Sequence, residues 1–390
     1  MKLCLHQRLS KLILRSVLPA TIVLTALMCC CSASADDAAE SAPRLTVKRD
    51  TDSSAADTTE TAAVADDQPL PSLSESGFWF LNTKNSPQSF KRSCPKFCPA
   101  VTRYEKCVGF RPSSADEMWS GLEPGVPVCI VVHGSFVDTP SACYESPQIW
   151  NWIRSASMGD RMQMIYFHWP SFRRITPAVQ LDANSLGLQA ARNGYYLADL
   201  ISRLPADCPV CLIGHSHGGR VVASALHLMA GGSVQGFCHP HARCCGRSIR
   251  VVLSAAAVDH GWFNPGRRYD RALCCTECVL NMKNRMDPVL KVYPLRLPLI
   301  SGKAIGLVGL TDRDRRKTGG RSCRVVDYDV SQIVGCRHLL PYYFRSCRLA
   351  MAMRNYVYFP DHVSSAPVSQ AREKKSIQLA DIMPRMSSSE

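Results

Sequence analysis

Long apolar runs are scarce in this sequence of 390 residues. The one candidate, at positions 17–28, is about a dozen residues, well short of the roughly 20 that a membrane-spanning helix needs. A polytopic membrane protein is therefore excluded. Charged residues make up only 20% of the chain and hydrophobic residues 46%, which is the balance of a globular protein with a buried core. That balance also excludes a wholly disordered chain, a collagen and a coiled coil, and we find no internal repeat.

The first 35 residues have the pattern of an export signal. Four basic residues and no acid precede the apolar stretch, and 33–35 supplies the small residues after which signal peptidase cleaves. We therefore expect cleavage after Ala35 and an exported protein, which is periplasmic, in the cell envelope or secreted. The alternatives are an uncleaved signal that anchors the chain, or a lipoprotein anchored at one of the three cysteines at 29–31. Met28 is bulky for the residue before a lipid-carrying cysteine, which disfavours the lipoprotein.

The segments after the signal differ in charge. Residues 36–76 have almost no large apolar side chain and carry ten acidic against three basic residues, so we expect a disordered acidic tether. Residues 364–390 form a polar C-terminal tail. The chain carries +14, but the signal contributes +4 and the tether −7, which leaves +17 for residues 77–390. A domain at 77–363 would thus be strongly basic, so an anionic surface is a candidate partner, although no motif predicts a specific nucleic acid.

Short apolar runs rich in β-branched residues alternate with helical patterns in this domain. We expect strands at 78–81, 128–132, 164–168, 210–213, 249–256, 278–282 and 324–328. We expect helices at 146–156, 178–204, 217–229 and 338–353. Continuous apolar strands separated by helices predict an α/β fold, with a mostly parallel doubly wound sheet and helices on both faces. Ligands of such sheets bind beyond the carboxyl ends of the strands.

The most informative stretch is Gly214-His215-Ser216-His217-Gly218, a G-x-S-x-G between an expected strand and an expected helix. A serine on so sharp a turn exposes its hydroxyl, and Gly214 and Gly218 avoid clashes between strand and helix. The pattern therefore predicts that Ser216 is a nucleophile. The alternative is a glycine-rich turn with a serine that caps the helix.

With these motifs the chain resembles the α/β-hydrolase fold superfamily, and in particular bacterial esterase- and lipase-like serine hydrolases of unassigned substrate. The resemblance extends from about residue 78 to residue 359. It rests on the G-x-S-x-G stretch together with Phe78–Asn82, Val131–Gly134, His168–Ser171, Asn284–Pro288 and Val334–His338. It implies acyl transfer to a serine without a metal or cofactor.

The loop 133–135 follows an apolar strand upstream of the nucleophile. In the fold that the chain resembles, this loop supplies one backbone N–H of the oxyanion hole, and the residue after the nucleophile supplies the other. The resemblance thus implies Ser135 and His217 as donors, with Phe136 left open as the alternative to Ser135. His133 is expected to organise the loop without taking part in the chemistry.

An acid and then a base should follow the nucleophile along the chain. Asp259 and Asp287 follow successive expected strands and are both candidates for the acid. The usual position, after the second strand downstream of the serine, favours Asp287, and Pro288 keeps the backbone extended there. His338 follows the last expected strand and is the predicted base. The predicted triad is Ser216, Asp287 and His338, in which Asp287 could also cap a helix.

The sequence has 20 cysteines, of which 16 lie outside the signal. Cys129 and Cys211 fall in core strands and are expected to act as small hydrophobes. The stretches 94–107, 238–245 and 274–278 are disulfide candidates in an exported protein. The last two would also permit a zinc site, but no clean pair of C-x-x-C spacings is present, so we expect disulfides or free thiols and no metal.

Together these features predict an exported serine hydrolase that cleaves an acyl bond, in the first place a carboxylic ester of a small molecule or lipid. Residues 230–248 interrupt the core order and are the expected lid or excursion. Two alternatives stay open: an inactive relative that binds an envelope partner, and a metal-dependent hydrolase built on the Cys/His segments. The complete set of nucleophile, acid and base argues against the inactive relative. Contact with a membrane is expected only through an uncleaved signal or a lipid anchor.

Overall fold

The structure is a computed structural model, and it describes residues 76–89, 95–172, 179–240, 246–295 and 302–363. The predicted signal, tether and C-terminal tail lie outside these described residues, so the expectations about export stay predictions. Within the described residues, no helix has both the length and the apolar character to cross a bilayer.

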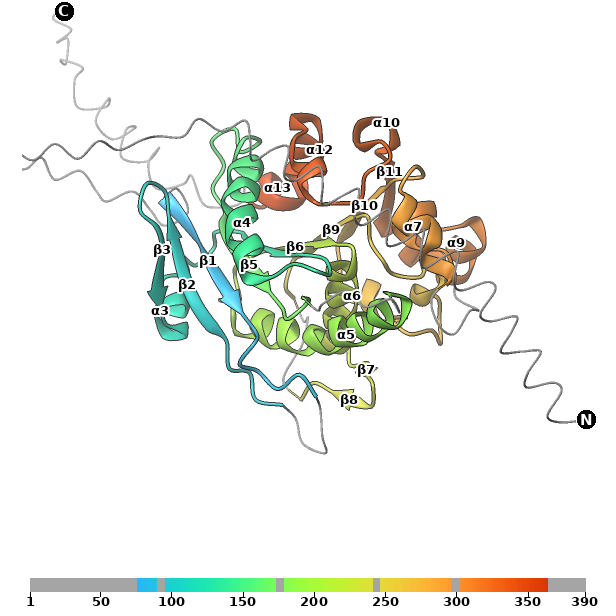
Figure 1. Ribbon diagram of the computed structural model, residues 1–390, viewed down its shortest axis with the longest axis horizontal. Helices are drawn as coiled ribbons and strands as arrows, with labels where there is room; N and C mark the ends of the chain where they lie inside the picture. Colours follow the sequence, from blue (N-terminus) through green and yellow to red (C-terminus); the bar gives the residue numbers. More distant parts are fainter. Residues whose placement is uncertain (1–75, 90–94, 173–178, 241–245, 296–301, 364–390) are drawn as a thin grey trace, which may run out of the picture.

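A nine-stranded sheet lies at the centre of the described chain, in the order β11-β10-β9-β6-β4-β5-β1-β2-β3 (Figure 1). Its strands are β1 (Gly77–Asn82), β2 (Ala100–Glu105), β3 (Gly109–Ser113), β4 (Val128–Val132), β5 (Gln163–His168), β6 (Val210–His215), β9 (Ile249–Ser254), β10 (Cys278–Lys283) and β11 (Val325–Asp329). Every neighbouring pair from β11 to β1 is parallel. β2 and β3 form an antiparallel hairpin at the β1 edge, which the sequence pattern did not predict.

Helices cover both faces of this sheet (Figure 1). The long ones are α4 (Thr139–Arg154), α5 (Val179–Arg203), α6 (His217–Met229) and α12 (Cys347–Tyr358). Successive residues of β4 alternate between two cores: Ile130 belongs to the cluster that includes α5 and α6 residues, and Val131 to the cluster that includes α4 and α12 residues. Burial on both faces explains why the central strands are continuous apolar runs. The predicted α/β class, a mostly parallel sheet flanked by helices, is confirmed.

The shorter elements lie in the connections between these strands and helices. They are α3 (Ala115–Ser120), β7 (Ser233–Val234), β8 (Phe237–Cys238), η1 (His260–Phe263), η2 (Ala272–Cys275), α7 (Pro288–Val292), η3 (Tyr293–Leu295), α8 (Ile305–Val308), α9 (Asp312–Thr318), η4 (Gly319–Arg324), α10 (Ser331–Val334), α11 (Pro341–Phe344) and α13 (Pro360–Val363).

The expected helix at 338–353 is wrong, because two shorter helices replace it. Pro341 occupies the first turn of α11, where its missing N–H is tolerated. Ser346 then caps α12, since its side chain accepts a hydrogen bond from the backbone N–H of Leu349. The break leaves His338 in a loop after β11 and before α11.

Residues 230–248 were expected to form a lid or an excursion, and the part that the structure describes forms an excursion. α6 starts directly after Ser216 and runs for 13 residues, which carries the chain about 20 Å away at 1.5 Å per residue. The β7–β8 hairpin follows the far end of α6 (Figure 1). These residues are therefore an excursion at the amino-terminal edge of the parallel strands, opposite the edge where Ser216 lies.

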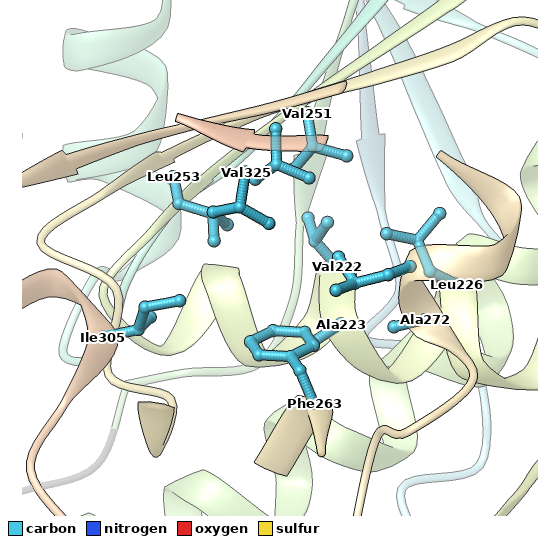
Figure 2. Close-up of a pocket in the computed structure, with 11 residues that line it drawn as sticks. Val222, Ala223, Leu226, Val251, Leu253, Phe263, Ala272, Ile305 and Val325 are labelled. Carbon is cyan, nitrogen blue, oxygen red and sulfur yellow. The ribbon is translucent and has the colours of Figure 1, made fainter. Parts of the chain in front are cut away.

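A small apolar cavity of about 20 Å³ lies between α6 and the sheet (Figure 2). Leu226 of α6, Leu253 of β9 and Phe263 of η1 point into it (Figure 2). An apolar lining offers no hydrogen bonds to water, so such a cavity stays dry and is a packing gap of the core.

We predict that Leu226→Ala lowers the free energy of unfolding by about 2–5 kcal/mol, because removal of the side chain enlarges a cavity that the surrounding core residues do not fill. The control is Leu188→Ala on α5, where the side chain is 43% exposed and the expected change is within about 0.5 kcal/mol. Denaturant unfolding of both variants checks this. Equal losses would contradict the placement of Leu226 in the core.

Candidate active site

Ser216 lies at the turn between β6 and α6 and has a backbone conformation that L-residues avoid. Its φ is 51° and its ψ is −120°. Such conformations cost of the order of 1–3 kcal/mol and persist only when neighbouring contacts hold them. Here the N–H of Ser216 donates to the carbonyl of Ser254 at 3.0 Å, and its own carbonyl accepts from the N–H of Ala257 at 2.9 Å. The end of β9 and the turn after it therefore fix this turn.

The two glycines of the turn are required by close packing. A Cβ on Gly218 would lie 2.2 Å from the carbonyl oxygen of Val132, and one on Gly214 would lie 2.8 Å from the Cα of Gly219. The start of α6 thus approaches β4 and β6 too closely for any side chain at either position. This is the steric reason for glycine that the motif predicted.

The structure brings the three predicted triad residues together. The Nε2 atom of His338 lies 3.0 Å from the Oγ of Ser216, and its Nδ1 lies 2.7 Å from the Oδ2 of Asp287. All three side chains are buried, with Asp287 fully so. The imidazole is therefore held between a hydroxyl and a carboxylate, as in a nucleophile, base and acid arrangement.

Asp287 uses its two carboxylate oxygens for different tasks. Oδ1 accepts a hydrogen bond from the backbone N–H of Leu290 at 3.0 Å and so caps α7, which starts at Pro288. Oδ2 faces His338. Capping and orientation of the imidazole are thus compatible, because the cap fixes the plane of the carboxylate.

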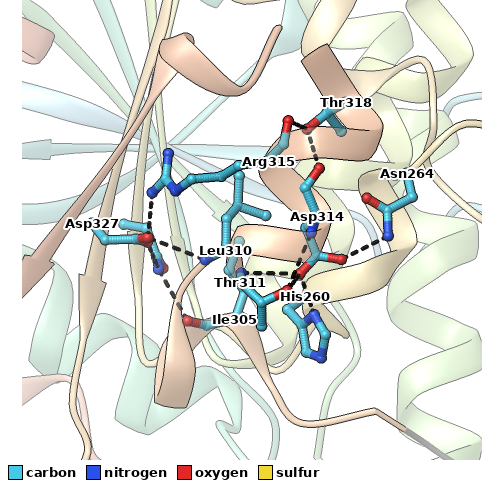
Figure 3. A network of polar contacts seen from close by, with 10 residues as sticks. His260, Asn264, Ile305, Leu310, Thr311, Asp314, Arg315, Thr318 and Asp327 are labelled. Carbon is cyan, nitrogen blue, oxygen red and sulfur yellow. Dashed lines mark hydrogen bonds and ion pairs between the residues drawn. The ribbon is translucent and has the colours of Figure 1, made fainter. Parts of the chain in front are cut away.

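Asp259, the alternative acid, lies in a different setting. It precedes η1 and forms an antiparallel bridge with Ala304. The residues after it bind Asp314 of α9: His260 Nδ1 lies 2.6 Å from Oδ2, and Asn264 donates to Oδ1 at 2.7 Å (Figure 3). Asp259 thus belongs to the segment that packs on α9, and the carboxylate at His338 is that of Asp287.

Asn284 is a site residue whose role the sequence did not reveal. It is fully buried, and its side-chain amide donates to the carbonyls of Gly335 at 2.8 Å and Arg337 at 3.2 Å. Its Oδ1 accepts from the N–H of Met286 at 3.0 Å. Asn284 therefore ties the loop that holds Asp287 to the loop that holds His338. It lies in the motif that carries the acid, but its partner Gly335 is 51 positions away, so no local pattern predicts the contact.

The contacts of the loop after β4 distinguish the two candidate oxyanion donors. The N–H of Phe136, a residue with φ 64°, donates to the carbonyl of Ser171 at 3.0 Å and is therefore engaged. For the N–H of Ser135, no acceptor is found among the described residues. His217, the expected second donor, is the first residue of α6. These contacts favour Ser135 over Phe136.

His133 and His168 form a buried pair behind this loop. The Nδ1–H of His133 donates to the carbonyl of Gly134 at 2.8 Å, and its Nε2 lies 2.8 Å from Nδ1 of His168. The hydroxyl of Thr139 lies 3.1 Å from the other nitrogen of His168. Burial, reinforced by His168, lowers the pKa of His133 well below its usual value. Burial also lowers the pKa of His168 to about 4, although Asp138 acts in the opposite direction. Both imidazoles are thus neutral at pH 7 and serve as hydrogen-bonding groups that shape the loop.

His215 lies beside the base, with its ring centroid 5.3 Å from that of His338. Burial is the main cause that lowers the pKa of His215 well below its usual value, with His338 contributing. A neutral His215 does not repel a positive charge that forms on His338.

The described part of the chain holds twelve free cysteine thiols, among them Cys98 and Cys107, whereas Cys275 is disulfide-bonded. Within the described residues, no group of three His, Cys, Asp or Glu side chains is placed to hold a metal ion. Residues 241–245, part of the Cys/His-rich segment, lie outside them, and so does Cys94. The expectation of further disulfides stays a prediction.

We predict that the protein loses stability as the pH falls from about 6.5 to 4. As the pH falls, a histidine whose pKa is lowered in the folded chain binds its proton at a higher pH in the unfolded chain. Its contribution to the free energy of unfolding is therefore complete above about pH 6.5 and is lost progressively below that pH. With a folded pKa of about 4, His168 alone costs about 2 kcal/mol of unfolding free energy at pH 5. Denaturant unfolding at pH 7 and pH 5 measures this. A His168→Gln variant with the same pH dependence as the wild type would contradict the assignment.

No protein-family model matches the sequence, and no curated protein matches it either. Among solved structures, it is similar to the crystal structure of a gene product of Listeria innocua, with 12% sequence identity and a TM-score of 0.32. The match covers 63% of this chain and 96% of that one. A likeness this distant carries no argument about function.

Proposed function

We propose that this protein is a serine hydrolase of the α/β-hydrolase type that cleaves an acyl bond, in the first place a carboxylic ester, through an acyl-enzyme. One observation carries the proposal: Ser216 Oγ, His338 and Asp287 form a continuous chain of contacts of 3.0 and 2.7 Å beyond the carboxyl ends of the parallel strands β6, β11 and β10. The order serine, acid, histidine along the chain supports the same fold type.

In the first half of the reaction, Nε2 of His338 takes the proton of the Ser216 hydroxyl as Oγ attacks the carbonyl carbon of the ester. The carboxylate of Asp287 accepts the Nδ1–H of His338, which fixes the tautomer with a free lone pair on Nε2 and stabilises the imidazolium that forms. The imidazolium then protonates the leaving alcohol. The acyl group stays on Oγ as an ester.

In the second half, His338 takes a proton from a water molecule, which attacks the acyl-enzyme and releases the carboxylic acid. In each half, negative charge develops on the former carbonyl oxygen. We assign this charge to the backbone N–H groups of Ser135 and His217, and removal of one such donor costs roughly 10²–10³-fold in kcat in serine hydrolases. His217 also begins a buried helix whose dipole favours negative charge at this end.

We expect a fluorophosphonate probe to label the wild-type chain once, on the peptide that contains Ser216. Ser216→Ala should abolish labelling. It should also lower the rate of hydrolysis of 4-nitrophenyl esters to about the uncatalysed rate, apart from the residual acceleration that substrate binding alone provides. Ser120→Ala on α3, whose hydroxyl donates to two carbonyls of its own helix, is the control and should label like the wild type. Mass spectrometry locates the adduct. A folded protein without label at Ser216 would support the inactive binding protein instead.

The two candidate acids give a second prediction. Asp287→Asn keeps a side chain that can cap α7 but cannot stabilise the imidazolium, so kcat should fall roughly 10⁴-fold with the fold retained. Asp259→Asn should keep kcat within about threefold per folded molecule, because Asp259 lies outside the triad. Ester hydrolysis and circular dichroism of both variants check this. If Asp259→Asn lowers kcat and Asp287→Asn does not, Asp259 is the acid.

A further inference from the structure

A side-chain hydrogen bond joins the two residues that carry the candidate oxyanion donors. The Oγ of Ser135 lies 2.6 Å from Nδ1 of the His217 imidazole. His217 is buried at the first position of α6, and every residue of that helix is buried. The loop of Ser135 is thereby attached to a helix that is buried over its whole length.

The other fixed points of the loop lie on either side of Ser135. Upstream, His133 binds the carbonyl of Gly134 and receives the N–H of Trp169 at 3.2 Å. Downstream, the N–H of Phe136 donates to Ser171. The Gly134–Ser135 peptide, which carries the Ser135 N–H, is thus held at its carbonyl, and the Ser135–Phe136 peptide is held at its N–H. The side chain of Ser135 adds a restraint between these two points, on the side of α6. The imidazole contact is the side-chain hydrogen bond that the structure provides there.

We propose that His217 is a positioning residue for the hydrolase reaction, whose imidazole holds Ser135 and so fixes the separation and direction of the two N–H groups that receive the oxyanion. This inference rests on the proposed function. It assigns His217 two separate tasks: the backbone N–H binds the oxyanion, and the side chain places the opposite donor. Misplacement of a preorganised donor by about 1 Å lowers the rate by up to roughly 10²-fold.

The test compares substitutions that keep or remove a polar atom at the position of Nδ1. His217→Asn places an amide close to that position, His217→Gln places it near Nε2 instead, and His217→Phe keeps the ring without nitrogen. We expect His217→Phe and His217→Gln to lower kcat for 4-nitrophenyl butyrate roughly 10- to 100-fold, with KM changed less than about threefold. His217→Asn should recover most of the loss.

A double-mutant cycle with Ser135→Ala tests whether the imidazole acts through Ser135. If it does, Ser135→Ala and His217→Phe each cause the same loss, and the double variant loses no more than either alone. Additive losses would overturn the proposal, because the imidazole would then act elsewhere. Ser135 is only partly buried, so Ser135→Ala also tests the contact if His217→Phe does not fold.

The second-order rate of fluorophosphonate labelling separates failure of this inference from failure of the proposed function. If the wild-type Ser216 is not labelled, the hydrolase assignment fails and the inference with it. If the wild type is labelled and hydrolyses the ester, but His217→Phe and Ser135→Ala keep kcat and the labelling rate within about twofold, only the positioning role of His217 is overturned.

Discussion

Ser216 occupies a backbone conformation with φ 51° and ψ −120°, and the arrangement of the site depends on that conformation being held. The hydrogen bonds to Ser254 and Ala257 fix it from the side of β9, while Gly218 lets the start of α6 lie against the carbonyl of Val132 in β4. Contacts from the neighbouring strands β4, β6 and β9 therefore converge on the turn that holds Ser216. The same contacts that stabilise the turn place Ser216 beyond the carboxyl end of β6, so the strain of the backbone and the position of the proposed nucleophile have one structural cause.

The parallel sheet brings Asp287 and His338, the proposed acid and base, to the same edge. β10 and β11 pair in parallel, so the loops that follow them, with Asp287 and His338, emerge side by side. Asn284 then locks the two loops through the carbonyls of Gly335 and Arg337. On the other side of Ser216, neutral buried histidines hold the loop of Ser135 from behind. Histidine thus serves as a hydrogen-bonding scaffold in this site as well as the proposed base, and burial lowers the pKa of the scaffold residues His133 and His168 so that they stay neutral.

The sequence predicted what depends on local pattern, and it missed what depends on distant contacts. The apolar strands and α6 were predictable because burial on both faces leaves continuous apolar runs, and the G-x-S-x-G turn was predictable because its glycines have a steric reason. The helix at 338–353 was wrong because Pro341 and Ser346 divide it. The sequence left open whether 230–248 is a lid or an excursion, because interruption of the core order does not say at which edge of the sheet a segment lies. The role of Asn284 and the contact between Ser135 and His217 join residues 51 and 82 positions apart, beyond the reach of any local signal.

The central claim is that Ser216 Oγ becomes covalently acylated during turnover. Rapid acid quenching of the wild-type protein with a 4-nitrophenyl ester, followed by mass spectrometry of the intact chain and its peptides, measures this directly. The account predicts one acyl group per chain, on the peptide that contains Ser216. If an activated ester first acylates the His338→Ala variant, the acyl group should persist longer there than in the wild type. Turnover of the ester with no acyl group on Ser216, or with the acyl group on another residue, would contradict it.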